Sequence, residues 1–182
     1  PLELPLFGIN DGIYLQHHDR PGLMTKREIR IQLLADLELP KEGVIWDIGA
    51  GVGSVGLEAL RLRPHLKLLS VDKRVGTKEL IKKNALKLGV EPYKILEKEA
   101  LDFFQENYIH EEISKPNRVL LGGGGKNRKE ILMLIMKNLA SGGLIVIPLV
   151  TLEGLHEIID SLKSNNYELS VNQYQSSRGV AL

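Results

Sequence analysis

Two aspartates and a run of glycines have the spacing of a site for a nucleotide-like cofactor. Asp47 ends a short apolar run, and Gly49, Gly51 and Gly53 follow it at alternate positions. Asp72 ends the next apolar run, about 20 residues further on, where an acid that binds ribose hydroxyls is expected. Glycines let a backbone approach a ligand closely, and the start of a following helix offers free N–H groups. The stretch therefore predicts a cofactor cradle.

The glycine pattern fits two cofactor classes. Residues Gly51–Gly56 match G-x-G-x-x-G, the fingerprint of dinucleotide-binding proteins, so an NAD-dependent oxidoreductase is one alternative. In that fingerprint the first glycine directly follows the strand, whereas here Gly49 already turns the chain. The wider pattern that begins at Asp47, D-I-G-A-G-V-G, resembles the first motif of class I S-adenosylmethionine-dependent methyltransferases. We therefore expect S-adenosyl-L-methionine as the cofactor.

The groups of S-adenosylmethionine suit these residues. Its ammonium favours a nearby carboxylate such as Asp47, and Asp72 can accept hydrogen bonds from its ribose hydroxyls. Its carboxylate needs N–H donors, which the loop and the helix start provide. Its adenine is flat and neutral, so apolar contact and a backbone donor at Ala100 suffice.

Apolar runs that alternate with amphipathic stretches predict the elements that position this cradle. Strands are expected at 44–48, 66–71, 93–96, 118–121 and 144–149, each followed by a helix, with a further strand at 167–174. A capping box at Thr25–Glu28 predicts a helix before the first strand. Such alternation indicates an α/β fold with a doubly wound, mostly parallel sheet and helices on both faces. Its ligands bind beyond the carboxyl ends of the strands.

Composition narrows the class of protein. The 182 residues are 43% hydrophobic and 26% charged, which predicts a single domain over 1–182 with an irregular lead at 1–24. A net charge of +1 gives no electrostatic reason to expect nucleic acid or a membrane surface as partner. No apolar run reaches transmembrane length and no signal peptide is evident, so we expect a cytoplasmic protein.

Residue types also limit the chemistry. Cys is absent, which excludes disulfides, thiolate metal sites and the thiolate that cytosine-C5 methyltransferases use. His17 and His18 precede Asp19, but adjacent histidines point in different directions, so we expect no metal site. No N-P-P-[YF] motif follows the fourth strand, which disfavours methylation of exocyclic amines. No residue is predicted to be a catalytic acid or base.

Several further segments carry motifs that occur together in one enzyme family. Residues 21–30 resemble a P-G-x-x-M-T-K-x-E-x-R segment, and residues 44–51 resemble V-W-D-I-G-A-G, including the unusual Trp46. Residues 122–125 resemble a glycine-rich loop, residues 150–153 a V-T-L-E motif and residues 7–11 the first segment of the same family. Together these segments resemble the precorrin-6B (C15) methyltransferase family, whose decarboxylating enzymes act in cobalamin biosynthesis. The resemblance implies a Rossmann-like class I methyltransferase that methylates C15 of a precorrin and removes carbon dioxide from the C12 acetate. It also implies a homotetramer, which in some members is paired with a C5-methyltransferase domain.

The resemblance also implies roles for individual residues. Thr25 would contact the amino-acid end of the cofactor, Asp72 its ribose and Ala100 its adenine. The residues expected to bind the cofactor are Thr25, Asp47, Gly49, Ala50, Gly51, Val52, Gly53, Asp72, Glu99 and Ala100. Because a precorrin carries many carboxylates, cations near the strand ends are expected to hold it. These are Arg20, Lys126 and Arg128, with Lys26 and Arg30 as further candidates.

The sequence also departs from the family pattern. Pro148 stands where the family often has Asn, and the loop at 122–125 lacks the usual Ser or Thr. We expect the last antiparallel strand of such folds to be missing, because the sequence ends at Leu182. Two other functions therefore stay open: an RNA-modifying class I methyltransferase, and a cofactor-binding module without catalysis.

Overall fold

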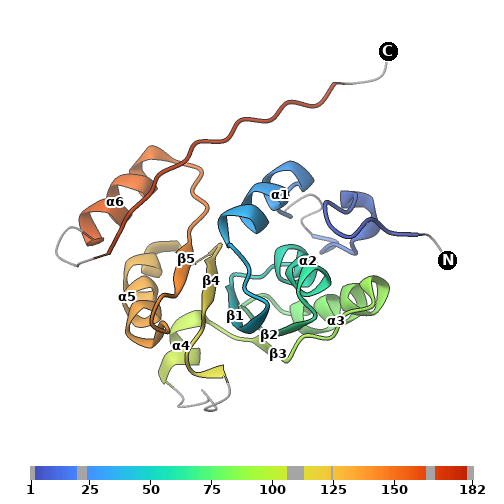
Figure 1. The fold of residues 1–182 in the computed structure, drawn as a ribbon, viewed down its shortest axis with the longest axis horizontal. Coiled ribbons are helices and arrows are strands. Elements are labelled where there is room, and N and C mark those ends of the chain that lie inside the picture. The colour runs from blue at the N-terminus through green and yellow to red at the C-terminus, as the bar shows by residue number, and fades with distance from the viewer. Residues whose placement is uncertain (1–2, 20–23, 106–112, 124, 163–166, 180–182) are drawn as a thin grey trace. The chain divides into compact units, whose positions relative to one another are not determined.

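The computed structural model describes residues 3–19, 24–105, 113–123, 125–162 and 167–179 (Figure 1). The chain forms two compact units, Pro1–Pro148 and Leu149–Leu182. The first unit contains the sheet and the glycine loop; the described part of the second contains one helix and residues 167–179, which form no helix or strand. A single domain over the whole chain stays a prediction.

The first unit is built on a parallel sheet of five strands in the order β3-β2-β1-β4-β5. The strands are β1 (Glu42–Ile48), β2 (His65–Asp72), β3 (Lys94–Glu97), β4 (Arg118–Leu121) and β5 (Leu144–Val146). Strand β1 is central and pairs with both β2 and β4, so the strand order reverses beside it. The carboxyl end of β1 is therefore the switch point at which open α/β sheets bind ligands.

Helices cover both faces of this sheet, which confirms the predicted α/β fold (Figure 1). Helices α1 (Arg27–Asp36), α2 (Ser54–Leu62) and α3 (Thr77–Leu88) lie on one face, and α4 (Ala100–Gln105) and α5 (Arg128–Asn138) lie on the other. Ile45 of β1 belongs to the core under the first group. Its neighbour Trp46 packs edge-on against Phe103 of α4, with ring centroids 5.3 Å apart. Burial on both faces explains why β1 reads as a continuous apolar run.

Among the residues that the structure describes, the first unit also contains two short 3-10 helices. They are η1 (Asp11–Ile13) in the lead segment and η3 (Gly125–Asn127) before α5. The first lies within residues 1–24, the stretch for which an irregular lead is predicted. The predicted N-cap of α1, Thr25, is wrong by one residue: the helix begins at Arg27 with Lys26 as its N-cap, and no side-chain cap bond forms. The Thr25 carbonyl instead accepts a hydrogen bond from Arg30 Nη1 at 2.6 Å.

The second unit contains α6 (Leu152–Leu162). Thr151 Oγ1 accepts a hydrogen bond from the Gly154 N–H at 3.1 Å and so caps the start of this helix. The strand predicted at 167–174 is wrong: these residues are extended but pair with no strand among the described residues. Alternating apolar residues give a segment one apolar face, but a strand also needs a neighbour for its backbone groups. Among the described residues, no helix is long and apolar enough to cross a membrane.

Candidate cofactor site

The loop after β1 is tied to the end of β2 by backbone hydrogen bonds. The N–H groups of Gly49 and Ala50 both donate to the Val71 carbonyl, at 2.8 and 3.1 Å. The Gly53 N–H donates to the Ala50 carbonyl at 2.8 Å and closes the turn. All of these bonds are made between backbone groups of the protein, so the loop holds its shape without a bound ligand. The loop leads directly into α2, which begins at Ser54.

The three glycines of this loop have different roles, although all have positive φ angles of +84°, +58° and +78°. A Cβ atom on Gly49 would lie 2.7 Å from the Gly123 backbone nitrogen, so Gly49 lets the loops after β1 and β4 touch. A Cβ atom on Gly53 would lie 3.1 Å from Ile81 of α3. A Cβ atom on Gly51 would meet no atom within 4 Å. Gly51 is therefore the glycine that borders open space, where a ligand can approach.

Alanine substitutions should separate these roles. We expect Gly49→Ala to lower the free energy of unfolding by about 2 kcal/mol or more, because the residue gains left-handed strain and a clash with backbone atoms. Gly51→Ala carries the strain without the clash, so about 1 kcal/mol is expected, together with weaker binding of S-adenosylhomocysteine. Urea denaturation and calorimetry measure the two effects. Equal losses of stability in the two variants would contradict this assignment.

Asp72 connects the end of β2 to the glycine loop. Its Oδ2 accepts a hydrogen bond from the Gly51 N–H at 2.8 Å, and its Oδ1 accepts one from the Arg74 N–H at 2.9 Å. The residue is 9% exposed. Each carboxylate oxygen has a second lone pair, so Asp72 can still accept hydroxyl donors. The sequence predicts that Asp72 binds ribose hydroxyls, and this role stays a prediction; the sequence did not reveal that Asp72 also holds the loop.

Asp47 lies deeper than the sequence suggests. It is 2% exposed, and its Oδ2 has no hydrogen-bond partner among the described residues. The same holds for the hydroxyl of Ser70, its register partner on β2. Burial raises the pKa of Asp47 to about 7, a hydrogen bond from the Gly56 backbone opposes this, and the negative charge of Asp72 adds to it. Contact between Asp47 and a cofactor ammonium stays a prediction.

The end of β3 lies beside Asp72. The Lys98 N–H donates to the Asp72 carbonyl at 2.9 Å, which brings the residues after β3 next to the end of β2. Glu99 forms an exposed ion pair with Lys73, at 3.0 Å, and Ala100 begins α4. The structure therefore gathers the expected ribose and adenine contacts at one edge of the sheet.

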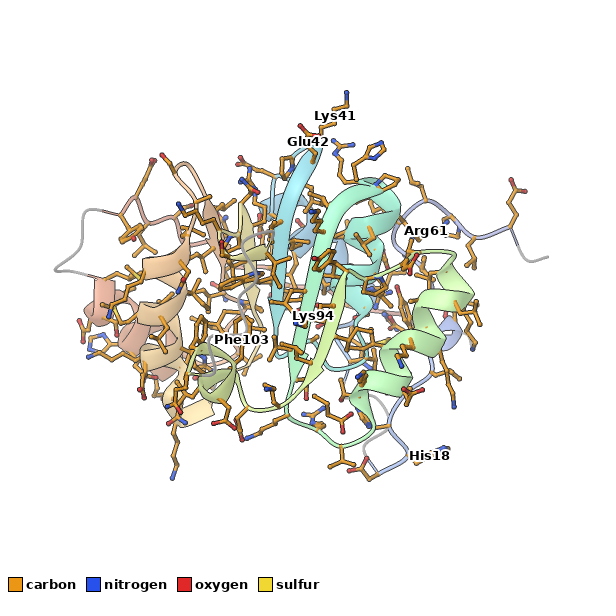
Figure 2. The ribbon with its side chains drawn as sticks, turned by 90° about the horizontal axis from the view of Figure 1, so that it is seen from below. His18, Lys41, Glu42, Arg61, Lys94 and Phe103 are labelled. Atoms are coloured by element: carbon orange, nitrogen blue, oxygen red, sulfur yellow. The ribbon has the colours of Figure 1, made fainter. Side chains whose placement is uncertain are left out.

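Figure 2 shows Lys41 and Glu42 at the amino end of β1 and His18 near the opposite end of the sheet.

The cationic candidates differ in their surroundings. Arg128 is half-buried, and its Nε donates at 3.3 Å to the carbonyl of Gly123, the residue of the loop after β4 that lies against Gly49. Lys126 is exposed in η3, Lys26 is exposed before α1, and Arg20 lies outside the described residues. Arg30 was a wrong candidate for substrate binding, because its side chain is fully buried. It pairs with Glu58 and Asp11, each at 2.8 Å.

A surface hollow of about 730 Å³ lies at the other end of the sheet. It is lined by the start of β2, including Leu66 and Lys67, and by Tyr93 before β3. Ligands of open α/β sheets bind at the carboxyl ends of strands, so this hollow is not the site formed by the glycine loop.

Comparisons with known proteins agree with this arrangement. A family model described as the precorrin methyltransferase domain matches residues 16–181. A protein of Pyrobaculum aerophilum, named probable cobalt-precorrin-6B C(15)-methyltransferase (decarboxylating), is 33% identical over 177 residues, which are 96% of this chain and 86% of that protein. The crystal structure of precorrin-6Y C5,15-methyltransferase from Geobacter metallireducens is 30% identical with a TM-score of 0.77, over 91% of this chain and 83% of that one. A methyltransferase of Geobacter sulfurreducens, solved with S-adenosyl-L-homocysteine, shares the fold at 21% identity and a TM-score of 0.53, over 66% of this chain and 47% of that one.

Proposed function

The chain belongs to the precorrin methyltransferase family, and we propose that it methylates C15 of a precorrin-6B-type tetrapyrrole and removes carbon dioxide from the C12 acetate. The fold is the Rossmann-like methyltransferase fold, and the cofactor is S-adenosyl-L-methionine. The observation that carries the proposal is the junction at the switch point, where Asp72 of β2 holds the Gly51 N–H of the loop after β1.

The residues at this junction fit the cofactor. Gly51 borders open space, and Asp72 keeps acceptor capacity for ribose hydroxyls beside it. Ala100 begins α4 next to the end of β2, where a backbone donor can meet adenine. When bound, S-adenosylmethionine supplies a methyl group on a sulfonium. The task of these residues is to hold the cofactor in one orientation relative to the substrate.

The reaction requires the protein to position the cofactor and the substrate more than to supply reactive side chains. Forming the bond from C15 to the methyl group draws one electron pair from the tetrapyrrole, and breaking the bond to carbon dioxide returns one pair to the same conjugated system. The chain therefore needs no covalent nucleophile, which agrees with its lack of Cys. Proximity and alignment of the two reactants are the main sources of rate in such a displacement.

A direct assay tests the proposal. The protein is incubated with methyl-labelled S-adenosylmethionine and a precorrin-6B-type substrate, in cobalt-bound and metal-free form in separate reactions. We expect the tetrapyrrole to gain one labelled methyl group and lose carbon dioxide with at least one form, as mass spectrometry can show. Binding of S-adenosylhomocysteine without any transfer would favour the module without catalysis. Transfer to RNA would favour the RNA-modifying alternative.

Arg128 is the cation that we expect to bind a substrate carboxylate. It lies at the start of α5 beside Gly123, where helix N–H groups add to its positive field. Loss of one charge-assisted contact is worth about 1.5 kcal/mol, so Arg128→Ala should raise the KM for the tetrapyrrole about tenfold. The KM for S-adenosylmethionine should stay unchanged.

Lys137→Ala is the matched control for Arg128→Ala, because it removes an exposed positive charge from the last turn of the same helix. Its KM for the tetrapyrrole should equal that of the unaltered protein. If Arg128→Ala also leaves this KM unchanged, Arg128 does not bind the substrate.

Assembly is a further part of the proposal. We propose a homotetramer, which light scattering of the purified protein tests directly. Pairing with a C5-methyltransferase domain is supported by the C5,15 name of the Geobacter metallireducens structure. The cytoplasmic location expected from the sequence stays a prediction.

A further inference from the structure

Residues 8–17, the part of the irregular lead that is called the lead segment from here on, are held by buried polar side chains of three helices. Glu58 of α2 accepts hydrogen bonds from the N–H of Ile9 at 3.3 Å and from the hydroxyl of Tyr14 at 2.8 Å. Arg30 of α1 pairs with the same carboxylate. The side chains of Arg30 and Glu58 are fully buried, so the segment is bound at a defined position on the helices. Most of this segment precedes the residues that the family model matches.

Asn84 of α3 joins this segment to the glycine loop. Its Oδ1 accepts a hydrogen bond from the Leu15 N–H at 2.8 Å, and its Nδ2 donates to the Leu15 carbonyl at 3.1 Å. The same Nδ2 donates to the Val52 carbonyl at 3.0 Å. Asn84 is fully buried. One side-chain amide therefore holds the backbone of two segments that are far apart in the sequence.

The bond to Val52 fixes one peptide plane of the loop at both ends. The Val52 carbonyl is held by Asn84, and the N–H of the same peptide, on Gly53, donates to Ala50. This peptide, between Val52 and Gly53, is the second one after Gly51, the residue that borders open space. Without Asn84 the carbonyl would be buried and unpaired, which favours a changed peptide orientation. The loop shape beside Gly51 would then change as well.

We propose that Asn84 is a positioning residue for the cofactor. It holds the lead segment and the Val52 peptide in place through hydrogen bonds, and it thereby determines the affinity of the chain for S-adenosylmethionine. This inference rests on the proposed cofactor site at Gly51 and Asp72. An asparagine is suited to the task because its amide accepts one hydrogen bond and donates two. An aspartate of the same size can only accept, so its carboxylate would face two carbonyl oxygens.

The lead segment also reaches the same edge of the sheet as the loop. His17 Nε2 lies 3.2 Å from the hydroxyl of Thr77, at the start of α3. His18 lies near the carboxyl end of the sheet (Figure 2). The end of the lead segment therefore lies at the edge of the sheet that carries the proposed cofactor site, not at the opposite edge.

Calorimetry with S-adenosylhomocysteine tests the inference on the full chain. Asn84→Asp and Asn84→Ala should each weaken binding about tenfold or more, which corresponds to one lost buried hydrogen bond. Hydrogen exchange of the free protein gives a second readout: amides at 49–54 should exchange faster in both variants. If Asn84→Asp fails to fold, Asn84→Ala carries the test, because it adds no buried charge.

Two control variants separate positioning from a general loss of structure. Lys87→Ala removes an exposed bond from α3 to the Ile13 carbonyl but touches no loop residue. Leu88→Ala lowers stability through a buried residue of the same helix. Both should bind S-adenosylhomocysteine within about threefold of the unaltered protein at temperatures where they are folded.

The outcomes are distinct. If the unaltered protein binds no S-adenosylhomocysteine, the proposed cofactor site is wrong. If it binds and the folded Asn84 variants bind equally well, the positioning role is wrong. If Leu88→Ala weakens binding as much as Asn84→Ala, the effect is one of stability, and the inference is overturned.

Discussion

Replacing Asp72 with alanine is expected to weaken binding of S-adenosylhomocysteine by about 100-fold or more. The carboxylate is proposed to accept both ribose hydroxyls, and each charge-assisted hydrogen bond is worth about 1.5 kcal/mol or more. The substitution also leaves the N–H groups of Gly51 and Arg74 without their acceptor. Both losses act on the same binding site, so calorimetry should show a larger loss of affinity for Asp72→Ala than for Gly51→Ala or Asn84→Ala.

A neighbouring acid provides the matched control for Asp72→Ala. Glu97 is the register partner of Asp72 on β3 and accepts a hydrogen bond from the Lys78 N–H at 3.0 Å, but it is exposed. Glu97→Gln removes a negative charge from the same edge of the sheet and should leave affinity within about threefold. Asp72→Asn keeps one acceptor and should fall between the two. Binding by Asp72→Ala within threefold of the unaltered protein would refute the ribose role.

The sheet could be predicted because its strands carry their own signal. An apolar run ended by Asp47 or Asp72 indicates a strand that is buried on both faces, and the structure places both strands at the centre of the first unit. Trp46 shows the physical reason: it lies against Phe103 on one face while Ile45 fills the core of the other. Periodicity alone did not reveal that 167–174 lacks a partner strand, because pairing depends on other segments.

The contacts that shape the loop could not be predicted in the same way. The motif predicted one common role for the three glycines. In the structure, however, Gly49 must lack a Cβ atom because the backbone of Gly123, in the loop after β4, lies against it. Asn84 gave no signal in the sequence, because an asparagine on a helix is ordinarily a surface residue. The sequence likewise indicated an accessible cation at Arg30, because an arginine on a helix is also ordinarily a surface residue. Each of these roles depends on tertiary neighbours that are distant in sequence.

The lead segment illustrates the same limit. Prolines and glycines predicted an irregular stretch over residues 1–24, and residues 8–17 contain no helix or strand except η1. The lack of regular structure does not make the segment loose, since its backbone groups are bound by side chains of α1, α2 and α3 rather than by its own neighbours. Local sequence predicts the absence of a helix or strand, but it does not show which side chains take over the backbone hydrogen bonds.

Asp47→Asn is expected to change how the stability of the protein depends on pH. Burial raises the pKa of Asp47 from its usual 3.8 to about 7 in the folded chain. The folded state therefore binds one more proton than the unfolded state between these values, so stability falls as pH rises from about 4 to about 7. The full cost, up to about 4 kcal/mol, is present above pH 7 and absent below pH 4. A neutral asparagine removes this dependence.

Urea denaturation at several pH values measures the effect. At pH 8 the Asp47→Asn protein should be more stable than the unaltered protein, and at pH 4 the difference should vanish. Ser70→Ala is the matched control, because it removes the other buried and unpaired oxygen at the same register position while Asp47 stays in place. Its stability should still fall with rising pH. If Asp47→Asn follows the same pH curve as Ser70→Ala, Asp47 is already ionised in the folded chain and must have a partner for its charge.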